Sequence, residues 1–295
     1  MFKKIHFIYS LVVLVLMTSC LGENPFEEQR KKDEQTTKDY VAKNSLVGTY
    51  TSSGVFYALT TPNPAGTLVG ANGIAEVSYK LFNLDKIKLA ESSSYIFKPS
   101  VGSFAAGLSE GVSLMRKGEK ATLVIPSALA FGTSRVTIGN IVIPANSVIV
   151  IEVEVLEVRT DQQQTEYERG IIRNYFATKI TPPITTFSKD TADVYVINQA
   201  PTTATTSLIP NLNYSVDYVL RRATGDNAIL DQGTLPYLHS VNSVIRGFYV
   251  GMLSMRVGGR GYIGVPSSMG YGSTGSSGKI PPYTPLIFEI TNIRQ

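Results

Sequence analysis

The order of hydrophobic and polar residues predicts a chain built mainly of short strands. Residues 74–84, IAEVSYKLFNL, and 213–222, NYSVDYVLRR, alternate between apolar and polar side chains, as half-buried strands do. Residues 120–126, KATLVIP, and 147–158, SVIVIEVEVLEV, are rich in β-branched residues, which favour strands. The glycine- and proline-rich stretch TTPNPAGTLVGANG at 60–73 is expected to be a loop.

Three stretches have the spacing of helices instead. Residues 102–115, GSFAAGLSEGVSLM, and 244–255, VIRGFYVGMLSM, carry apolar side chains at helical intervals and predict one short helix in each half. In residues 161–180, Tyr167, Ile171 and Tyr175 recur every four positions, which predicts a helix with one apolar face. We expect this helix to pack on the second half of the chain, because three large apolar side chains are otherwise exposed.

The chain repeats itself on the scale of a whole domain. Residues 115–132, MRKGEKATLVIPSALAFG, align without a gap with 255–272, MRVGGRGYIGVPSSMGYG. The predicted order of strands, loops and helix also recurs, and this repeat is too long for a solenoid unit of a few tens of residues. It predicts two domains, at 45–160 and 161–295. Further pairs match across the repeat: Tyr79 with Tyr218, Gly107 with Gly247, and Ile143-Pro144 with Ile280-Pro281.

The N-terminus has the pattern of a targeting segment. Lys3 and Lys4 precede the apolar run FIYSLVVLVLM, which is typical of a signal peptide at 1–19 and too short for a comfortable membrane span. The end of the run, LMTSC, resembles the lipobox of bacterial lipoproteins, with Met17 where leucine is usual. This resemblance implies lipidation of Cys20 after cleavage. The alternative is a chance thiol at the cleavage site of an ordinary secreted protein.

The segment that follows is expected to connect the lipid to the folded domains. Residues 20–44 are polar and mixed in charge, and we interpret them as a tether that becomes helical near Tyr40. Leu21 stands where an aspartate commonly retains lipoproteins in the inner membrane. We therefore expect a location in the bacterial cell envelope, at the outer membrane, with the membrane contacted through the lipid anchor.

Composition and charge exclude several classes of protein. The 295-residue chain is 43% hydrophobic and 17% charged, which is a globular composition. Its net charge of +4 falls to +2 when Lys3 and Lys4 are removed, leaving 25 basic against 23 acidic residues, so nothing favours nucleic acid as a partner. The glycine-rich GRGYIG at 259–264 leads into Pro266 rather than a helix, which argues against a phosphate-binding loop.

The scarcity of cysteine and histidine points away from metal and nucleophilic chemistry. Cys20 is the single cysteine, so an intramolecular disulfide is excluded. His6 leaves with the signal peptide, and we interpret His239 as a surface or rim residue in a loop. Zinc sites and Cys-His or Ser-His catalysis are therefore disfavoured, and we expect no metal and no cofactor.

Four stretches of the second half carry a family resemblance. VIRGF at 244–248, GMLSMRVGG at 251–259, VPSSMGYGSTG at 265–275 and IPPYTPLIFEI at 280–290 resemble the signature of the FKBP-type peptidyl-prolyl isomerases. The resemblance covers about 214–295 and, more weakly, about 72–158 in the first half. It implies an α+β fold of two tandem FKBP-like domains. In each, a curved antiparallel sheet wraps over a short helix, with the peptide-binding pocket between them.

The resemblance also implies a site in the second domain. Tyr218, Asp231 and Tyr271 match its catalytic positions, and Tyr271 is the residue whose hydroxyl bonds a substrate carbonyl. Phe248 replaces the tryptophan that usually floors the pocket, and Leu235 replaces a phenylalanine. Each residue also has a purely structural interpretation, and Asp231 could be an ordinary hairpin aspartate in LDQG. The implied substrate-binding residues are Leu235, Val244, Ile245, Phe248, Ile280 and Phe288.

The first domain departs further from the family pattern. The family's aspartate falls near Leu89 and Ala90, so that carboxylate is missing, and Phe131 replaces the carbonyl-binding tyrosine. We expect that this domain has lost efficient catalysis and binds polypeptide or acts as a scaffold. The remaining pocket positions are Tyr79, Tyr95, Phe104, Ala105, Leu108, Ile143 and Ile151.

Three functional hypotheses follow. The first is a peptidyl-prolyl isomerase that assists the folding of exported proteins, acts on proline-containing or unfolded polypeptides and has its activity mainly in the second domain. Rotation about an X-Pro bond has a barrier of roughly 18–20 kcal/mol and requires no nucleophile, metal or cofactor. The second hypothesis is a non-catalytic polypeptide-binding lipoprotein, and the third is a structural lipoprotein whose pockets are filled.

Overall fold

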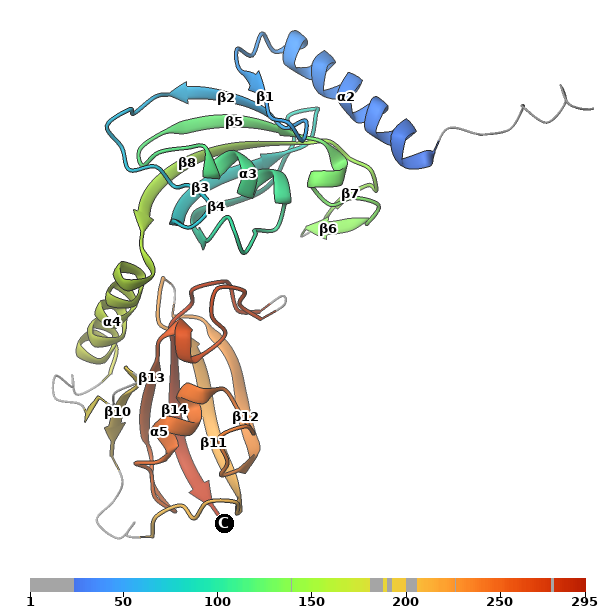
Figure 1. Ribbon diagram of the computed structural model, residues 1–295. Helices are drawn as coiled ribbons and strands as arrows, with labels where there is room; N and C mark the ends of the chain where they lie inside the picture. Colours follow the sequence, from blue (N-terminus) through green and yellow to red (C-terminus); the bar gives the residue numbers. More distant parts are fainter. Residues whose placement is uncertain are drawn as a thin grey trace, which may run out of the picture.

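The computed structural model describes residues 24–138, 140–180, 188–189, 193–199, 206–225, 227–276 and 279–295. The predicted signal peptide and the predicted lipidation site at Cys20 lie outside these residues. Two six-stranded antiparallel sheets form the framework, one in each half of the chain (Figure 1). None of the helices within the described ranges is long and apolar enough to cross a bilayer.

The first half consists of a leading helix, a sheet and one inner helix that lies across that sheet. Its leading helix is α2, Pro25–Lys43, and its inner helix is α3, Ala106–Ser113. A short 3₁₀ turn, η1, spans Ser127–Leu129. The strands are β1 Thr49–Tyr50, β2 Phe56–Thr61, β3 Ile74–Phe82, β4 Lys88–Phe97, β5 Lys120–Ile125, β6 Val136–Ile138, β7 Ile141–Ile143 and β8 Ile149–Arg159.

The second half repeats this order. It begins with α4, Asp161–Thr178, and its inner helix is α5, Arg246–Met252. The 3₁₀ turn η2 spans Ser267–Met269. The strands are β9 Ser188–Lys189, β10 Tyr195–Asn198, β11 Asn213–Arg222, β12 Ile229–Leu238, β13 Gly261–Val265 and β14 Leu286–Arg294.

The two sheets have the same topology strand for strand. The first runs β1-β2-β5-β8-β3-β4, and the second runs β9-β10-β13-β14-β11-β12 when read from its other edge. The duplication inferred from the sequence therefore extends to the whole sheet. The expected α+β fold is confirmed.

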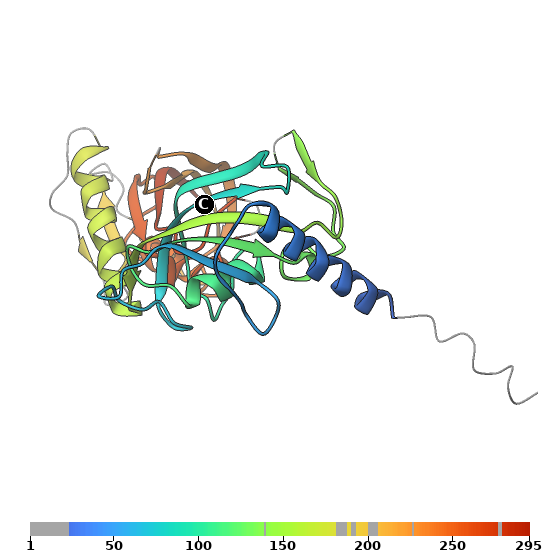
Figure 2. The same cartoon turned by 90° about the horizontal axis from the view of Figure 1, so that it is seen from above.

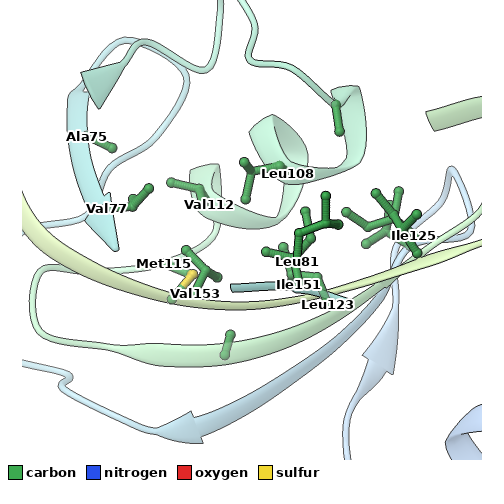
Figure 3. Close-up of a cluster of buried hydrophobic side chains, with 14 of the residues drawn as sticks. Ala75, Val77, Leu81, Leu108, Val112, Met115, Leu123, Ile125, Ile151 and Val153 are labelled. Atoms are coloured by element: carbon green, nitrogen blue, oxygen red, sulfur yellow. The ribbon is translucent and has the colours of Figure 1, made fainter. Parts of the chain in front are cut away.

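The inner helices lie close against their sheets because glycine faces the strand. A Cβ added at Gly247 meets Val265 Cγ1 at 2.3 Å, and one added at Gly107 meets Ile125 Cγ2 at 2.4 Å. Gly247 and Gly107, which match across the sequence repeat, therefore have the same role in the two domains. Around these glycines, apolar side chains of the helix and the sheet interdigitate; in the first domain Leu108 and Val112 of α3 face Leu123 of β5 (Figure 3).

The leading helices cover the opposite face of each sheet. Alternation along a strand sends neighbouring side chains to opposite faces, so Val124 of β5 joins a second core with Tyr40 of α2. In the second domain Ile172 and Phe176 of α4 pack with Ile287 of β14. Seen from above, α2 and α4 lie at opposite sides of the molecule (Figure 2).

Both leading helices differ in detail from the sequence-based expectation. Most of the predicted tether is helix α2, in which Asp33, Thr37 and Tyr40 are buried. Two of these three residues are polar, so the hydropathy pattern could not indicate a packed face. Helix α4 is confirmed, but its buried face centres on Ile172, Tyr175 and Phe176, whereas Tyr167 stays 38% exposed with the guanidinium of Arg159 4.0 Å from its ring centre.

Candidate active site

The apolar residues predicted to form the site lie in one cluster of the second domain. Tyr218, Leu235 and Tyr271 are half-buried, whereas Phe248, Ile280 and Phe288 are buried. Val244 and Ile245 join the cluster from the segment just before α5. The cluster therefore has a buried apolar floor and a partly accessible margin.

Strand register places three of these residues. Phe288 of β14 lies opposite Leu220 of β11, and Leu235 of β12 lies opposite Val216. Tyr218, two residues from each of these β11 positions, shares their face of the sheet because side chains alternate along a strand. Phe248 reaches the same cluster from α5, which crosses this face.

Aromatic contacts form the floor. The rings of Phe248 and Phe288 meet edge to face, with centroids 4.9 Å apart and planes at 65°. The rings of Tyr218 and Phe288 follow at 6.3 Å and 40°. Edge-to-face and offset pairs at these separations stabilise by about 0.5–1.5 kcal/mol each beyond the area they bury, so the floor is held in a defined shape.

A polar pair stands at the margin of this cluster. The hydroxyl of Tyr218 donates a hydrogen bond of 2.6 Å to Asp231 Oδ2. The pairing of β11 with β12 makes this possible, because Asp231 lies opposite Leu220, close to Tyr218 along the strand. The predicted catalytic residues Tyr218 and Asp231 are thus brought together by the sheet.

The Tyr218 phenol stays neutral over a wide pH range. Burial, then the hydrogen bond and negative charge of Asp231, and lastly the neighbouring Tyr271 raise the pKa of Tyr218 to about 12. Tyr271 packs against the same cluster as Tyr218, so both phenols belong to this site. The site therefore combines one carboxylate and two phenols beside an aromatic floor, and the phenols are able to donate hydrogen bonds to a carbonyl.

The first domain has the same cluster with different chemistry. Ala90 lies opposite Leu81 in the register that places Asp231 opposite Leu220, so a methyl group stands where the second domain has a carboxylate. Phe131 lies at the position of Tyr271 and packs against the core. All of the remaining matched residues belong to this core: Tyr79, Tyr95, Phe104, Ala105, Leu108, Ile143 and Ile151.

Three rings of the first domain also contact each other where the second domain has its polar pair. Tyr79 lies 5.9 Å from Tyr95 and 5.0 Å from Phe104, and Tyr95 lies 5.7 Å from Phe104. All three are half-buried. The first domain therefore presents an aromatic surface in place of a phenol–carboxylate pair.

Sequence reasoning missed some residues that support the site. Leu230 and Met269 pack against the cluster, and Leu230 could have been found from its position beside Asp231. The interpretation of His239 as a surface residue is wrong, since it is 2% exposed and its Nδ1 lies 2.7 Å from the hydroxyl of buried Tyr237. Tyr237 in turn meets Phe248 edge to face at 5.6 Å, so this pair lies behind the floor.

The described residues hold no group of three or more His, Cys, Asp or Glu side chains placed to bind a metal ion. What the site offers is an apolar surface and hydrogen-bond donors.

Comparison with known proteins identifies the family. The model of the FKBP-type peptidyl-prolyl cis-trans isomerases matches residues 68–156 and 212–292, one match in each domain. Because these matches take in more than half of the chain, the protein belongs to this family.

Individual relatives match parts of the chain. The FK506-binding protein of Neisseria meningitidis serogroup A is 46% identical over 50 residues, which are 17% of this chain and 46% of that protein. The FKBP-type isomerase FkpA of Buchnera aphidicola is 27% identical over 138 residues, 45% of this chain and 53% of the relative. The chain therefore spans about half the length of these relatives. The crystal structure of FkpA from Escherichia coli is 27% identical, with 45% of this chain and 62% of that chain covered and a TM-score of 0.38.

Proposed function

We propose that this protein is a peptidyl-prolyl cis-trans isomerase whose activity resides mainly in the second domain. The observation that carries the proposal is the Tyr218–Asp231 hydrogen bond beside Tyr271, at the half-exposed margin of an aromatic floor. The family assignment supports the same reaction.

These residues suit rotation about an amide bond. A planar X-Pro amide is more charge-separated than its twisted form, so an apolar surface favours the twisted form relative to water. Phe248 and Phe288 supply that surface for the proline ring, and the Tyr271 hydroxyl donates to the substrate carbonyl while the bond turns. Binding that fits the transition state better than the ground state is sufficient to accelerate the reaction.

The first domain, in this proposal, contributes little catalysis. Phe131 cannot donate a hydrogen bond to a carbonyl, and Ala90 gives Tyr79 no carboxylate partner. The substrates are proline-containing segments of exported proteins. The sequence of the N-terminus supports lipid anchoring at Cys20, with the folded domains in the cell envelope at the outer membrane.

The test is a proline-limited peptide isomerisation assay on the full chain. We expect Tyr271→Phe and Asp231→Ala each to lower kcat/KM by about 3- to 10-fold, the effect of losing one hydrogen bond in the transition state, while the protein stays folded by circular dichroism. Phe131→Leu is the matched control in the first domain and should leave the rate unchanged. A wild-type rate equal to that of the uncatalysed reaction refutes the proposal.

A second candidate function is binding of unfolded polypeptide without isomerisation. The three half-buried rings of Tyr79, Tyr95 and Phe104 favour it. An aromatic surface binds apolar segments of a polypeptide without a phenol–carboxylate pair. Suppression of the aggregation of an unfolded protein, measured alongside an absence of isomerisation, selects this function over the first.

A further inference from the structure

A buried carboxylate connects the leading helix α4 to the turn that carries Tyr271. Glu168 of α4 is 2% exposed, and Ser267, the first residue of η2, is 4% exposed. The Ser267 backbone N–H donates to Glu168 Oε2 at 2.7 Å, and the Ser267 hydroxyl donates to Oε1 at 2.8 Å. A single carboxylate thus satisfies both donors of one serine.

The carboxylate itself is held from its own helix. Gln164, one turn earlier on α4 and also 2% exposed, donates its side-chain N–H to Glu168 Oε1 at 2.9 Å. Burial raises the pKa of Glu168, and these three hydrogen bonds oppose that rise. A buried carboxylate is costly unless it is hydrogen-bonded, so both its oxygens are fixed toward η2.

Ser267 in turn holds the backbone on both sides of Tyr271. Its carbonyl accepts from the amide of Gly270 at 2.9 Å and from the amide of Gly272 at 2.8 Å. Gly272 has a φ of +61°, a conformation that other residues adopt only with strain. The path from Glu168 to the peptide units flanking Tyr271 is therefore a continuous chain of hydrogen bonds.

The first domain contains the matching carboxylate–serine hydrogen bonds, but its turn carries no phenol. Asp33 of α2 is 3% exposed and accepts from the Ser127 backbone N–H at 2.8 Å and from the Ser127 hydroxyl at 2.6 Å. Gln29 supports it at 2.6 Å, and the Ser127 carbonyl accepts from Gly132 at 2.8 Å. The residue in this turn is Phe131, which has no hydroxyl. The first domain is therefore a natural control, in which the same hydrogen bonds cannot position a phenol.

We propose that Glu168 is a positioning residue of the second domain's site, which fixes where the Tyr271 hydroxyl lies by clamping Ser267. This inference rests on the proposed isomerase function. A purely structural role, in which Glu168 only attaches α4 to the domain, predicts the same loss of activity whether or not Tyr271 has its hydroxyl. A positioning role predicts a loss that depends on that hydroxyl.

The decisive experiment is a double-mutant cycle on the full chain. Glu168→Gln replaces one accepting oxygen by a donor that faces the donors of Gln164 and Ser267. We expect it to lower kcat/KM for a proline peptide by about 10-fold or more, because displacements near 1 Å have effects of this size, and by less than about 2-fold when Tyr271→Phe is already present. Equal losses in the two backgrounds overturn the proposal.

Two further variants sharpen the cycle. Asp33→Asn breaks the matched connection in the first domain and should change kcat/KM by less than about 2-fold; a loss as large as that of Glu168→Gln would point to a general effect on folding and count against positioning. Glu168→Asp, which copies the shorter acid of the first domain, should recover part of the activity lost in Glu168→Gln.

A second readout keeps this inference separate from the proposed function. Amide hydrogen exchange at Gly270 and Gly272 should accelerate by about 10-fold or more in Glu168→Gln and stay unchanged in Asp33→Asn. If the wild type has no isomerase activity but exchange responds in this way, the proposed function fails while the clamp on the Tyr271 turn stands. Unchanged exchange in Glu168→Gln overturns the positioning role irrespective of activity.

Discussion

The close approach of α5 to the sheet makes Gly251→Ala the most direct test of how the candidate site is held. A Cβ at Gly251 meets Ile263 Cγ2 at 2.3 Å and Cδ1 at 2.7 Å, whereas ordinary van der Waals contact lies at 3.4–4 Å. Ile263 is fully buried on β13, and its β-branched side chain is stiff about χ1. The clash is therefore relieved only if α5 moves away from the sheet.

The magnitude follows from two opposed effects. Alanine is better than glycine in a helix by up to about 1 kcal/mol, whereas overpacking a core costs about 1–3 kcal/mol. We expect a net loss of roughly 1–2 kcal/mol in the free energy of unfolding of the second domain. The shift also carries Phe248, on the same helix, away from Phe288, now 4.9 Å away, so isomerase activity should fall as well.

Differential scanning calorimetry of the full chain is the assay. The second domain's transition should fall by several degrees in Gly251→Ala, at roughly 2–8 °C per kcal/mol for domains of this size. Gly170→Ala on α4 is the matched control: its new Cβ has no atom within 4 Å, so only the helix-propensity gain remains and the transition should rise. A rise in both variants refutes the close-packing argument.

Two pH dependences follow from titratable groups in and behind the site. Burial lowers the pKa of His239 from its ordinary 6.5, so the folded chain binds a proton at this side chain more weakly than the unfolded chain does. The stability of the second domain should therefore be fully present above pH 6.5 and fall as the pH drops below that value. His239→Gln should flatten that slope in melting temperature, and an unchanged slope contradicts the assignment. The pKa of Tyr218 is raised from 10.0 to about 12, so its contribution is present below pH 10 and is lost as the pH rises through about 12. Tyr218→Phe should remove this alkaline loss, which the same melting curves measure, and an equal loss in the variant would mean that other tyrosines cause it.

The repeat, the α+β class and the family could all be predicted from the amino-acid sequence alone. These features follow from local patterns: apolar and polar residues alternate along 213–222, apolar residues have helical spacing along 244–255, and one motif occurs twice. The residues of the candidate site could also be selected from the sequence, because the motif carries them in fixed order. Their roles as catalytic and substrate-binding groups stay predictions until the assays above are made.

Which polar residues are buried, and which partners they have, could be seen only in the folded structure. Asp33 bonds a serine 94 positions away, and Glu168 bonds one 99 positions away. In the sequence both acids stand among other charged residues and look solvated, and His239 looks like an ordinary loop residue. A polar side chain is stable in the interior only when distant elements bring it a partner. That pairing depends on which faces of helix and sheet come together, so it cannot be predicted from a local sequence pattern.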